Sequence, residues 1–390
     1  MATDYTGTPA SMIALMQASR QRLAHKVTID GTDRSDNVIS INREWSWGQA
    51  CQVCTLELTT SAGGYSPDSK VEVWEGYNDG IYKTFTGMVD VIEQSGPPYV
   101  LKLRCRDMLK RVVDNFLADN SDETFKTPYH TFNNIQAETA IQWLLDNSYA
   151  HTWTTASDIT YSLATSSYTV GNPTSHTGES GYAGYDVNLM SAMDVVNEIS
   201  KSVSFYMLAW QRKIYWATYN TASTAIITEN APGWNFTNND SYGDIIKVNS
   251  KTASDERLRN KIVVYGYGGL KPSVPYDPTY GIYEQDSAYR PAGYRQTAIV
   301  TSLMYDTQGL VDWAANDIYT KLSIATEYIS LTVLGNPIVR LGDPANVVIT
   351  NAGELNTNAL YYIYGLRTHM GVNPASYTTQ VTLSKNNGGQ

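Results

Sequence analysis

A pair of cysteines can hold a metal ion or exchange electrons, and the motif CQVC supplies one such pair, Cys51 and Cys54. A closed zinc site needs four ligands, and neither a second pair nor a nearby histidine accompanies this motif. Cys54, Leu56 and Leu58 occupy every second position, so they lie on one face of a predicted strand. Leu101, Leu103 and Cys105 show the same spacing. We therefore predict that Cys54 and Cys105 lie in the core, and we expect no metal ion and no cofactor.

Carboxylates are the second group that could do chemistry, since two facing acids suffice to cleave a glycosidic bond. Asp277, Glu284 and Asp286 lie among tyrosines in the segment YDPTYGIYEQDSAYRP. A sugar site or a calcium site could use these acids, but a solvated, ordered loop that uses tyrosine at an interface is the better explanation, because one acid cluster in a long insertion is ordinary. We favour the loop.

The other catalytic patterns are incomplete. No histidine has a second histidine at helical or hairpin spacing, and the five are His25, His130, His151, His176 and His369. The sequence contains no G-x-S-x-G motif, and YGYGG at 265–269 does not continue into G-x-G-x-x-G before a helix. We expect no catalytic residues and no enzyme activity.

Glycine-rich turns carry the strongest local signals. In VEVWEGYNDGIYKTFTGMVDVI, starting at residue 71, strand letters break at YNDG, whose residues tolerate the positive φ of a hairpin turn. The segment LGNPIVRLGDPANVVI predicts a turn–strand–turn–strand corner in which Pro337 and Pro344 break the ladder. The predicted structural turn residues are Gly76, Gly80, Gly87, Gly335, Gly342 and Asp343.

Composition narrows the class of protein. The chain has 390 residues, more than one core usually holds, so we expect two or three domains. Its net charge is −10 and no basic block occurs, which argues against sequence-specific binding of nucleic acid. No stretch approaches the roughly 20 apolar residues that cross a bilayer, and the start lacks a basic leader, so we expect no membrane span. Tyrosine outnumbers phenylalanine 29 to 6, which suits large, half-wet interfaces.

The spacing of extended segments predicts the first domain. Residues 26–108 hold six segments separated by Gly, Pro or Asp, a cadence typical of a small antiparallel β-barrel. They are KVTIDG, NVISINREWSW, CQVCTLELTT, KVEVWEG, KTFTGMVDVIEQ and PPYVLKLRCRDML. Ahead of them, an early proline and spaced apolar residues predict an N-terminal helical arm at 1–25.

The rest of the chain predicts an α+β middle region at 109–243 and a second β-barrel at 244–390, with an insertion at 270–297. The middle region has two amphipathic stretches, NNIQAETAIQWLLDNS and MSAMDVVNEISKSV, and then a hairpin pattern, SFYMLAWQRKIYWATY. In the second barrel, DIIKVNSKTASDERLRNKIVVYGYG predicts two strands across a charged connection, and TQGLVDWAANDIYTKLS predicts a helix. The fold class is therefore mainly β with a helix-containing middle domain.

The order of these segments resembles the tail or baseplate hub proteins of tailed bacteriophages, and it is similar to the hub part of VgrG spikes. The resemblance covers about residues 26–385 and includes the hairpin at 71–92, SAMDVVNEISKSVSFYMLAWQRKIYWA, RNKIVVYGYG and YYIYGLRTHMGVNPASYTTQVTLS. It implies two barrels of the tail-tube type in each chain, with the α+β region between them.

The resemblance also implies a function and partners. It suggests a structural hub in the virion tail or baseplate, assembled in the host bacterial cytoplasm. Three chains would form a ring of six barrels around a DNA channel. A tail tube or distal tail protein would lie above the ring, a spike or tip protein below it, and other baseplate proteins beside it. The alternative is a carbohydrate-binding or carbohydrate-cleaving tail protein, a host adhesin that uses tyrosine, tryptophan and the acids at 277–286.

Overall fold

The computed structural model describes most of the chain between residues 22 and 385. The described residues are 16, 22–59, 64–78, 80–115, 129–149, 159–171, 185–188, 190–218, 234–238, 244–254, 258–259, 261–266, 276–277, 282–284, 297–302, 304–305, 307–322 and 326–385. Most of the predicted N-terminal arm therefore lies outside the described residues. Of that arm, Met16 is helical and buried in the main core, and Leu23 already begins the first strand.

The first strand group contains all six strands that the sequence predicts, plus a short extra one. Its members are β1 (Leu23–Ile29), β2 (Thr32–Asp33), β3 (Val38–Ser46), β4 (Val53–Thr59), β5 (Lys70–Tyr77), β6 (Gly80–Ser95) and β7 (Val100–Asp107). They pair antiparallel in the order β3-β4-β7-β6-β5-β1-β2. Alternating apolar residues on β4 and β7 bury one face, and this places Cys54 directly opposite Cys105 in the β4–β7 register.

The second strand group comes mostly from the last part of the chain. Its members are β15 (Trp234–Thr237), β16 (Ile245–Ser254), β21 (Thr326–Leu334), β22 (Pro344–Ile349), β23 (Thr357–Gly371) and β24 (Ser376–Ser384). Four of them pair in the order β16-β21-β24-β23. The strand β22 pairs antiparallel with β23, and β15 pairs parallel with β22. β15 comes from a stretch that the sequence assigns to the middle region.

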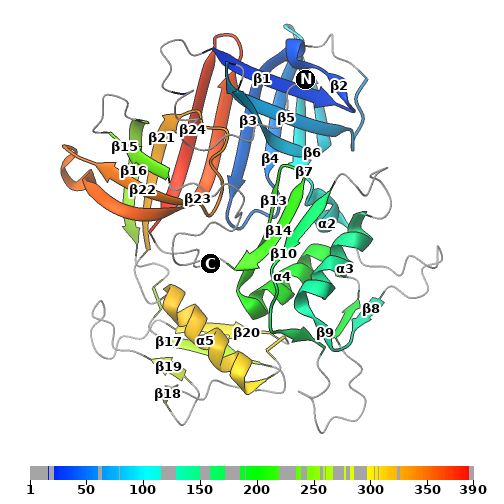
Figure 1. Cartoon of the computed structure of the whole chain (residues 1–390), viewed down its shortest axis with the longest axis vertical. Coiled ribbons are helices and arrows are strands. Elements are labelled where there is room, and N and C mark those ends of the chain that lie inside the picture. Colours follow the sequence, from blue (N-terminus) through cyan, green and yellow to red (C-terminus); the bar gives the residue numbers. More distant parts are fainter. Residues whose placement is uncertain are drawn as a thin grey trace.

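The two strand groups form one sheet rather than two separate ones. β23 pairs with β3 from Gly365 opposite Ser46 to Gly371 opposite Ser40, so the described strands make a single 13-stranded sheet. Figure 1 shows the two groups side by side at one end of the molecule. Pairing among the described strands does not close either group, so the two barrels expected from the sequence are not seen as closed sheets.

The middle region has the predicted α+β character. Its helices are α2 (Lys110–Asp114), α3 (Ala137–Tyr149) and α4 (Ala192–Val203), and the last two confirm the amphipathic predictions. Its strands are β8 (Tyr129–Phe132), β9 (Ile135–Gln136), β10 (Thr160–Leu163), β11 (Thr169–Val170), β12 (Tyr185–Asn188), β13 (Phe205–Trp210) and β14 (Lys213–Thr218). The β13–β14 hairpin is also as predicted.

A small third unit replaces part of the predicted second barrel. β17 (Lys261–Tyr265) pairs with β19 (Ile282–Glu284) and β20 (Thr297–Thr301), and β18 (Tyr276–Asp277) pairs with β19. Helix α5 (Gln308–Leu322), which confirms the predicted helix, packs on this sheet. The two strands on either side of the charged connection therefore do not pair with each other, because β16 pairs with β21 of the large sheet instead.

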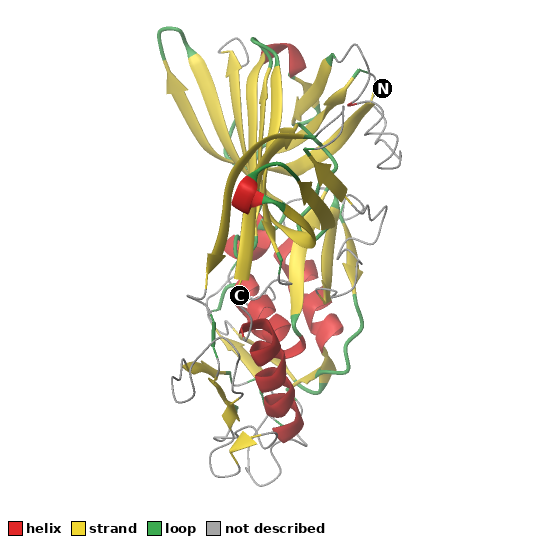
Figure 2. Ribbon diagram, turned by 90° about the vertical axis from the view of Figure 1, so that its left-hand side faces the viewer, coloured by secondary structure: helices red, strands yellow, loops and turns green. Residues whose placement is uncertain are grey.

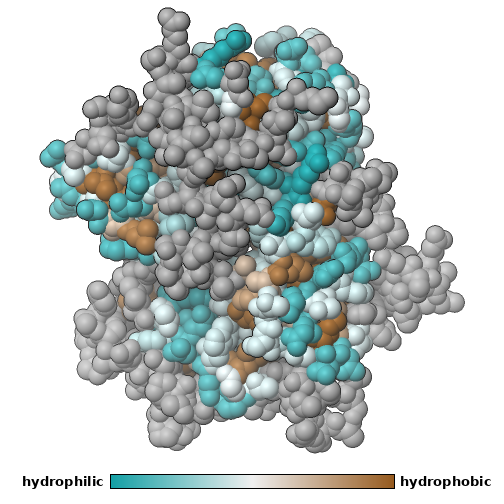
Figure 3. Space-filling model, viewed as in Figure 1, coloured by the Kyte–Doolittle hydropathy of each residue, from teal (hydrophilic) through white to brown (hydrophobic). Residues whose placement is uncertain are grey.

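Three cores hold these parts together. The largest is shared by both strand groups and by the β13–β14 hairpin, the second lies around α3 and α4, and the third lies between α5 and β17. The side view in Figure 2 shows the long helices in the half of the molecule away from the N-terminal strands. On the face drawn in Figure 3, the hydrophobic residues of the described part lie in small groups among hydrophilic ones. No helix in the described part is long and apolar enough to span a membrane.

Candidate functional site

A buried ion pair lies where the two strand groups meet. Arg43 on β3 donates from Nε to Glu75 Oε2 on β5 at 2.8 Å, and its Nη2 lies 2.5 Å from the same oxygen. Their side chains are only 5% and 0% exposed. Burial works to lower the pKa of Arg43, but the Glu75 carboxylate outweighs it, so the pKa lies above its usual value. A charge this deeply buried is tolerated only with its partner in place.

Two tyrosines at the same site link the first strand group to the second. The Tyr377 hydroxyl on β24 lies 3.5 Å from Glu75 Oε2, and the Tyr77 hydroxyl on β5 donates to the carbonyl of Gly335 at 2.7 Å. The two rings are 5.6 Å apart between centroids. We call Arg43, Glu75, Tyr77, Gly335 and Tyr377 the central joint. It connects strands of the first group to strands and turns of the second.

The sequence did not single out Arg43 or Glu75, although a signal for them was present. Glu75 shares the parity of Val71 and Val73, which are both fully buried, and Arg43 shares the parity of the buried Ile41. A charged residue on the core-facing side of a strand must find a partner there. The pairing itself follows from tertiary structure, since it joins β3 to β5, which are not neighbours in the sheet.

The segment that follows β21 packs as a buried double turn. All of the residues from 335 to 345 are buried, and Ile338, Val339 and Leu341 lie in the shared core. The predicted strand between the two turns is absent, and Pro344 begins β22 rather than breaking its ladder. Side chains satisfy the buried backbone instead: the amide of Asn336 donates to Thr379 Oγ1, and that of Ile338 donates to Asn336 Oδ1.

Two of the predicted turn glycines lie at the ends of this double turn. Gly342 has φ 79°, in the left-handed region that favours glycine. Gly335 is constrained in a different way, because an added Cβ would lie 2.1 Å from Cγ of the Tyr377 ring. Gly335 therefore permits a close approach of backbone to ring rather than a left-handed backbone.

Asp343 anchors the double turn from inside. Its Oδ2 accepts hydrogen bonds from Trp234 Nε1 on β15 at 3.0 Å and from the Arg340 amide at 3.2 Å. The Arg340 side chain pairs with the same oxygen at 3.4 Å. Complete burial raises the pKa of Asp343, and Arg340 opposes that rise. The Trp234 contact, which ties β15 to the turn, is not visible in the sequence.

The remaining predicted turn residues lie along the β5–β6 hairpin. Asn78 at its tip has φ 52°, and the strands pair from Tyr77 opposite Gly80. A Cβ on Gly76 would lie 2.0 Å from the Gly80 oxygen, and one on Gly87 would lie 2.2 Å from the Arg106 oxygen. Both faces of β5 are buried, so this hairpin lies inside the assembly of strands rather than on a free surface.

A second ionic contact connects the hairpin to the middle region. Glu72 on β5 pairs with Lys83 at 3.2 Å and with Arg212, from the β13–β14 turn, at 2.8 Å. Trp74 lies between Lys83 and Lys26, whose ammonium groups are 4.7 Å and 5.1 Å from the ring centroid. The hairpin thus contacts the second strand group on one side and the middle region on the other.

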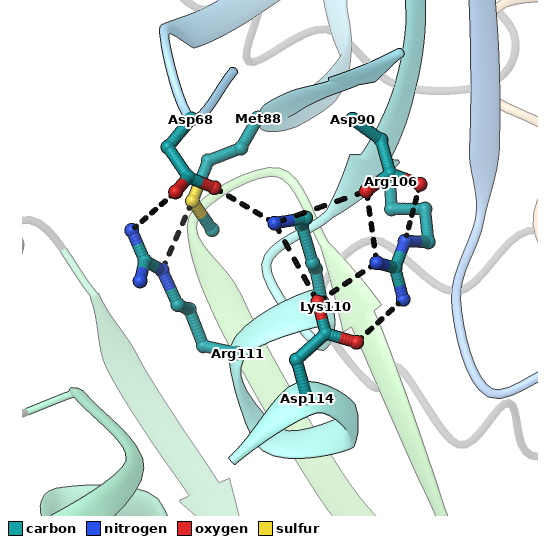
Figure 4. A network of polar contacts seen from close by, with 7 residues as sticks. All are labelled: Asp68, Met88, Asp90, Arg106, Lys110, Arg111 and Asp114. Atoms are coloured by element: carbon teal, nitrogen blue, oxygen red, sulfur yellow. Dashed lines mark hydrogen bonds and ion pairs between the residues drawn. The ribbon is translucent and has the colours of Figure 1, made fainter.

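A charge network fixes the start of the middle region, as Figure 4 shows. Arg106 on β7 makes paired hydrogen bonds to Asp90 and to Asp114, all between 2.8 and 3.0 Å. Lys110 on α2 lies 2.7 Å from Asp68. These contacts hold α2 against β6 and β7 at the point where the chain leaves the first strand group.

The candidate chemical groups do not converge on a reactive centre in the described part of the chain. Cys54 and Cys105 are buried core residues, as their strand parity predicts, and Cys51 is buried in the second core. No group of three metal-binding side chains occurs among the described residues. Asp277 and Glu284 end β18 and β19, and Asp286 lies outside the described residues.

Solved structures with the same architecture decide the fold. The tail protein from Neisseria meningitidis MC58 matches with a TM-score of 0.65 at 12% identity, over 93% of this chain and 96% of that one. The 43 kDa tail protein of prophage MuSo2 from Shewanella oneidensis matches with a TM-score of 0.61 at 12% identity, over 94% and 98%. This is a tail-protein fold.

A similar fold occurs within a longer chain. A chain of the Francisella PdpA–VgrG complex matches with a TM-score of 0.50 at 10% identity, over 94% of this chain and 53% of that one. At the level of fold, these matches confirm the resemblance seen in the sequence. No protein-family model and no curated protein matched the sequence.

Proposed function

We propose that this chain is a structural hub protein of a bacteriophage tail or baseplate, without enzyme activity. The observation that carries the proposal is the end-to-end match to the tail protein from N. meningitidis, which covers 93% of this chain and 96% of that one. Its place would be the virion tail, after assembly in the cytoplasm of the host bacterium.

The proposed assembly is a closed ring of three chains around the DNA channel. Among the described strands, the main path of the 13-stranded sheet ends in β16 on one side and in β1 with β2 on the other, and β15 forms a further edge beside β22. Pairing of one of these edges with a different edge of the next chain would be a head-to-tail contact, and such contacts close into a ring when the rotation permits it. The two strand groups of each chain would then act as two tube-like barrels and alternate around the ring, giving quasi-sixfold symmetry.

The ring would join two kinds of neighbour. The sixfold face would meet the tail tube or a distal tail protein, and the opposite face would hold the spike or tip protein and contact other baseplate proteins. The middle of the chain is acidic, since residues 111–250 hold 6 Lys and Arg against 14 Asp and Glu. This region would lie outside the ring or toward the tip, where its charge is hydrated. The central joint would keep the two strand groups of one chain at a fixed angle, as a ring requires.

The mass of the purified chain in solution tests this assembly. We expect a particle of three times the 43.2 kDa chain mass, with six similar lobes in averaged images. Ile246 on β16 is 55% exposed, and a lysine at an edge strand discourages pairing, so Ile246→Lys should give monomers. Leu360→Lys, at an exposed position on the interior strand β23, is the matched control and should still form trimers. A monomer bound at the tail periphery, or six copies in a ring, would refute the arrangement.

A further inference from the structure

A pocket of about 580 Å³ lies between the middle region and the third unit. Its walls are the loop at 165–169, the end of α4 with the start of β13, and the first turns of α5. Its volume falls in the range of small-ligand sites, which is about 300–1,000 Å³. Its described lining shares no residue with the central joint.

Hydrogen bonds hold the loop wall in place. The amide and the hydroxyl of Ser166 both donate to Glu138 Oε2 at 3.2 Å, and the amide of Ala137 donates to the Tyr168 carbonyl at 3.0 Å. These bonds fix the loop to the start of α3. A wall fixed before binding costs less entropy on binding than a mobile one.

The opposite wall is fixed to the middle region on both sides of the pocket. The Tyr168 hydroxyl donates to the Met304 carbonyl at 2.8 Å, just ahead of α5. Near the other end of α5, Ser204 donates to Asp317 Oδ2 at 2.7 Å, and Lys321 lies 2.8 Å from the same oxygen. The α5 wall is therefore docked to the middle region.

The lining has a distinct chemical character. Most of the described lining residues carry a hydroxyl, including Thr165, Ser167, Thr169 and Thr307, and none of them is an Asp, Glu, Lys, Arg or His. Thr169 and Thr307 also accept hydrogen bonds within the protein, from Gln136 Nε2 and from the Leu310 amide. Hydroxyls both donate and accept, so they suit a ligand that itself carries hydroxyls. The described lining offers no cationic side chain to a phosphate or carboxylate ligand.

The apolar part of the lining is aromatic and partly open. Trp313 is 38% exposed, although the buried residues of α5 are Val311, Ala314, Ala315 and Tyr319. Phe205 also lines the pocket and packs against the second core, with its ring centroid 4.6 Å from that of Trp216. An exposed indole gives a flat apolar surface beside a polar N–H, which suits a ligand with one apolar face and a polar rim.

We propose that this pocket binds a neutral saccharide. A sugar ring has a face of C–H groups that can pack on Trp313, and its hydroxyls can exchange hydrogen bonds with the Ser and Thr side chains of the loop wall. This activity goes beyond the structural role proposed above and does not depend on ring formation.

The proposal is tested by screening the purified chain on an array of neutral and acidic saccharides, with affinities then measured by titration calorimetry. We expect at least one neutral mono- or disaccharide to bind with a Kd of about 10 mM or tighter, and glucuronate not to bind. Trp313→Ala should weaken binding about tenfold or more, and Trp313→Phe should keep it within about threefold. Ser167→Ala should weaken it by a smaller factor.

A matched control distinguishes binding in the pocket from nonspecific binding to exposed aromatic residues. Tyr99 is 64% exposed on the turn between β6 and β7, in the first strand group, and it does not line the pocket. The variant Tyr99→Ala should therefore bind the sugar as the wild type does. The proposal is wrong if no neutral saccharide on the array binds, or if a folded Trp313→Ala variant binds unchanged. If Trp313→Ala instead prevents assembly into tails while no sugar binds, the pocket is a contact for a neighbouring protein.

Discussion

The Tyr77 hydroxyl donates a 2.7 Å hydrogen bond to the carbonyl of Gly335, although 258 positions separate the two residues in the sequence. Tyr77 ends the strand β5, and Gly335 begins the buried double turn of the second strand group. The bond therefore fastens the hairpin of one group to the turn of the other. This relationship makes the central joint sensitive to small changes on either side.

Adding a methyl group at Gly335 should disturb the joint. The Cβ of Gly335→Ala would lie 2.1 Å from the Tyr377 ring, so the ring must move away from Glu75 and Tyr77. Overpacking of this kind costs about 1–3 kcal/mol of unfolding free energy. Urea denaturation measures the loss, and Gly309→Ala, where a Cβ would meet no atom within 4 Å, is the control that should be close to neutral.

Gly342 tests the backbone of the same turn. Its φ of 79° is unfavourable for a β-branched residue, so Gly342→Val should lower the free energy of unfolding by more than about 1 kcal/mol. Thermal and urea denaturation provide the measurement. If folding and assembly were untouched, the interpretation of this corner would be wrong.

The buried ion pair should be far more costly to break than to replace. Arg43→Met leaves Glu75 as an uncompensated buried charge and should cost about 3–5 kcal/mol. The double variant Arg43→Met/Glu75→Leu should recover a large part of that loss, because no buried charge remains. A double-mutant cycle in urea gives both values, and equal losses for the single and double variants would contradict the argument.

The surface charge network should behave differently from the buried pair. Arg106 is 24% exposed, so Arg106→Gln should cost about 0.5–1 kcal/mol at low salt. The loss should shrink in about 1 M salt, because salt screens exposed charges. The Arg43→Met loss should change little over the same range, and a similar salt response of both variants would argue against this distinction.

Asp107 should make stability depend on pH. Its carboxylate accepts hydrogen bonds from the amides of Gln52 and Leu109, but complete burial dominates and raises its pKa to about 7 from the ordinary 3.8. The folded state then holds this proton more tightly than the unfolded state. The resulting stabilisation is fully present below pH 3.8 and is lost as the pH rises through about 7.

Asp107→Asn isolates this effect, because asparagine does not titrate. Between pH 5 and pH 8, the wild type should lose on the order of 2 kcal/mol of unfolding free energy relative to the variant. Urea denaturation at both pH values measures the difference. A difference between the two proteins that stays constant with pH would show that Asp107 does not titrate in this range.

Local sequence determined the elements of this protein. The six strands of the first group, the helices α3, α4 and α5 and the β13–β14 hairpin all follow from periods of two or 3.6 residues, which act over a few neighbouring positions. The left-handed backbone of Asn78 and Gly342 follows equally from residue type. The order of these elements also carried the resemblance to tail hub proteins.

Only the tertiary structure decided which elements meet. The pairing of β23 with β3, the Arg43–Glu75 pair and the Tyr77–Gly335 bond all join residues far apart in the chain. The same is true of β17, which pairs with β19 and β20 in the third unit rather than with β16. A strand's own pattern specifies which face it buries but not which edge it pairs with, because every strand offers the same backbone donors and acceptors. The choice among partners depends on how distant side chains fill one shared core, and that is a property of the folded chain.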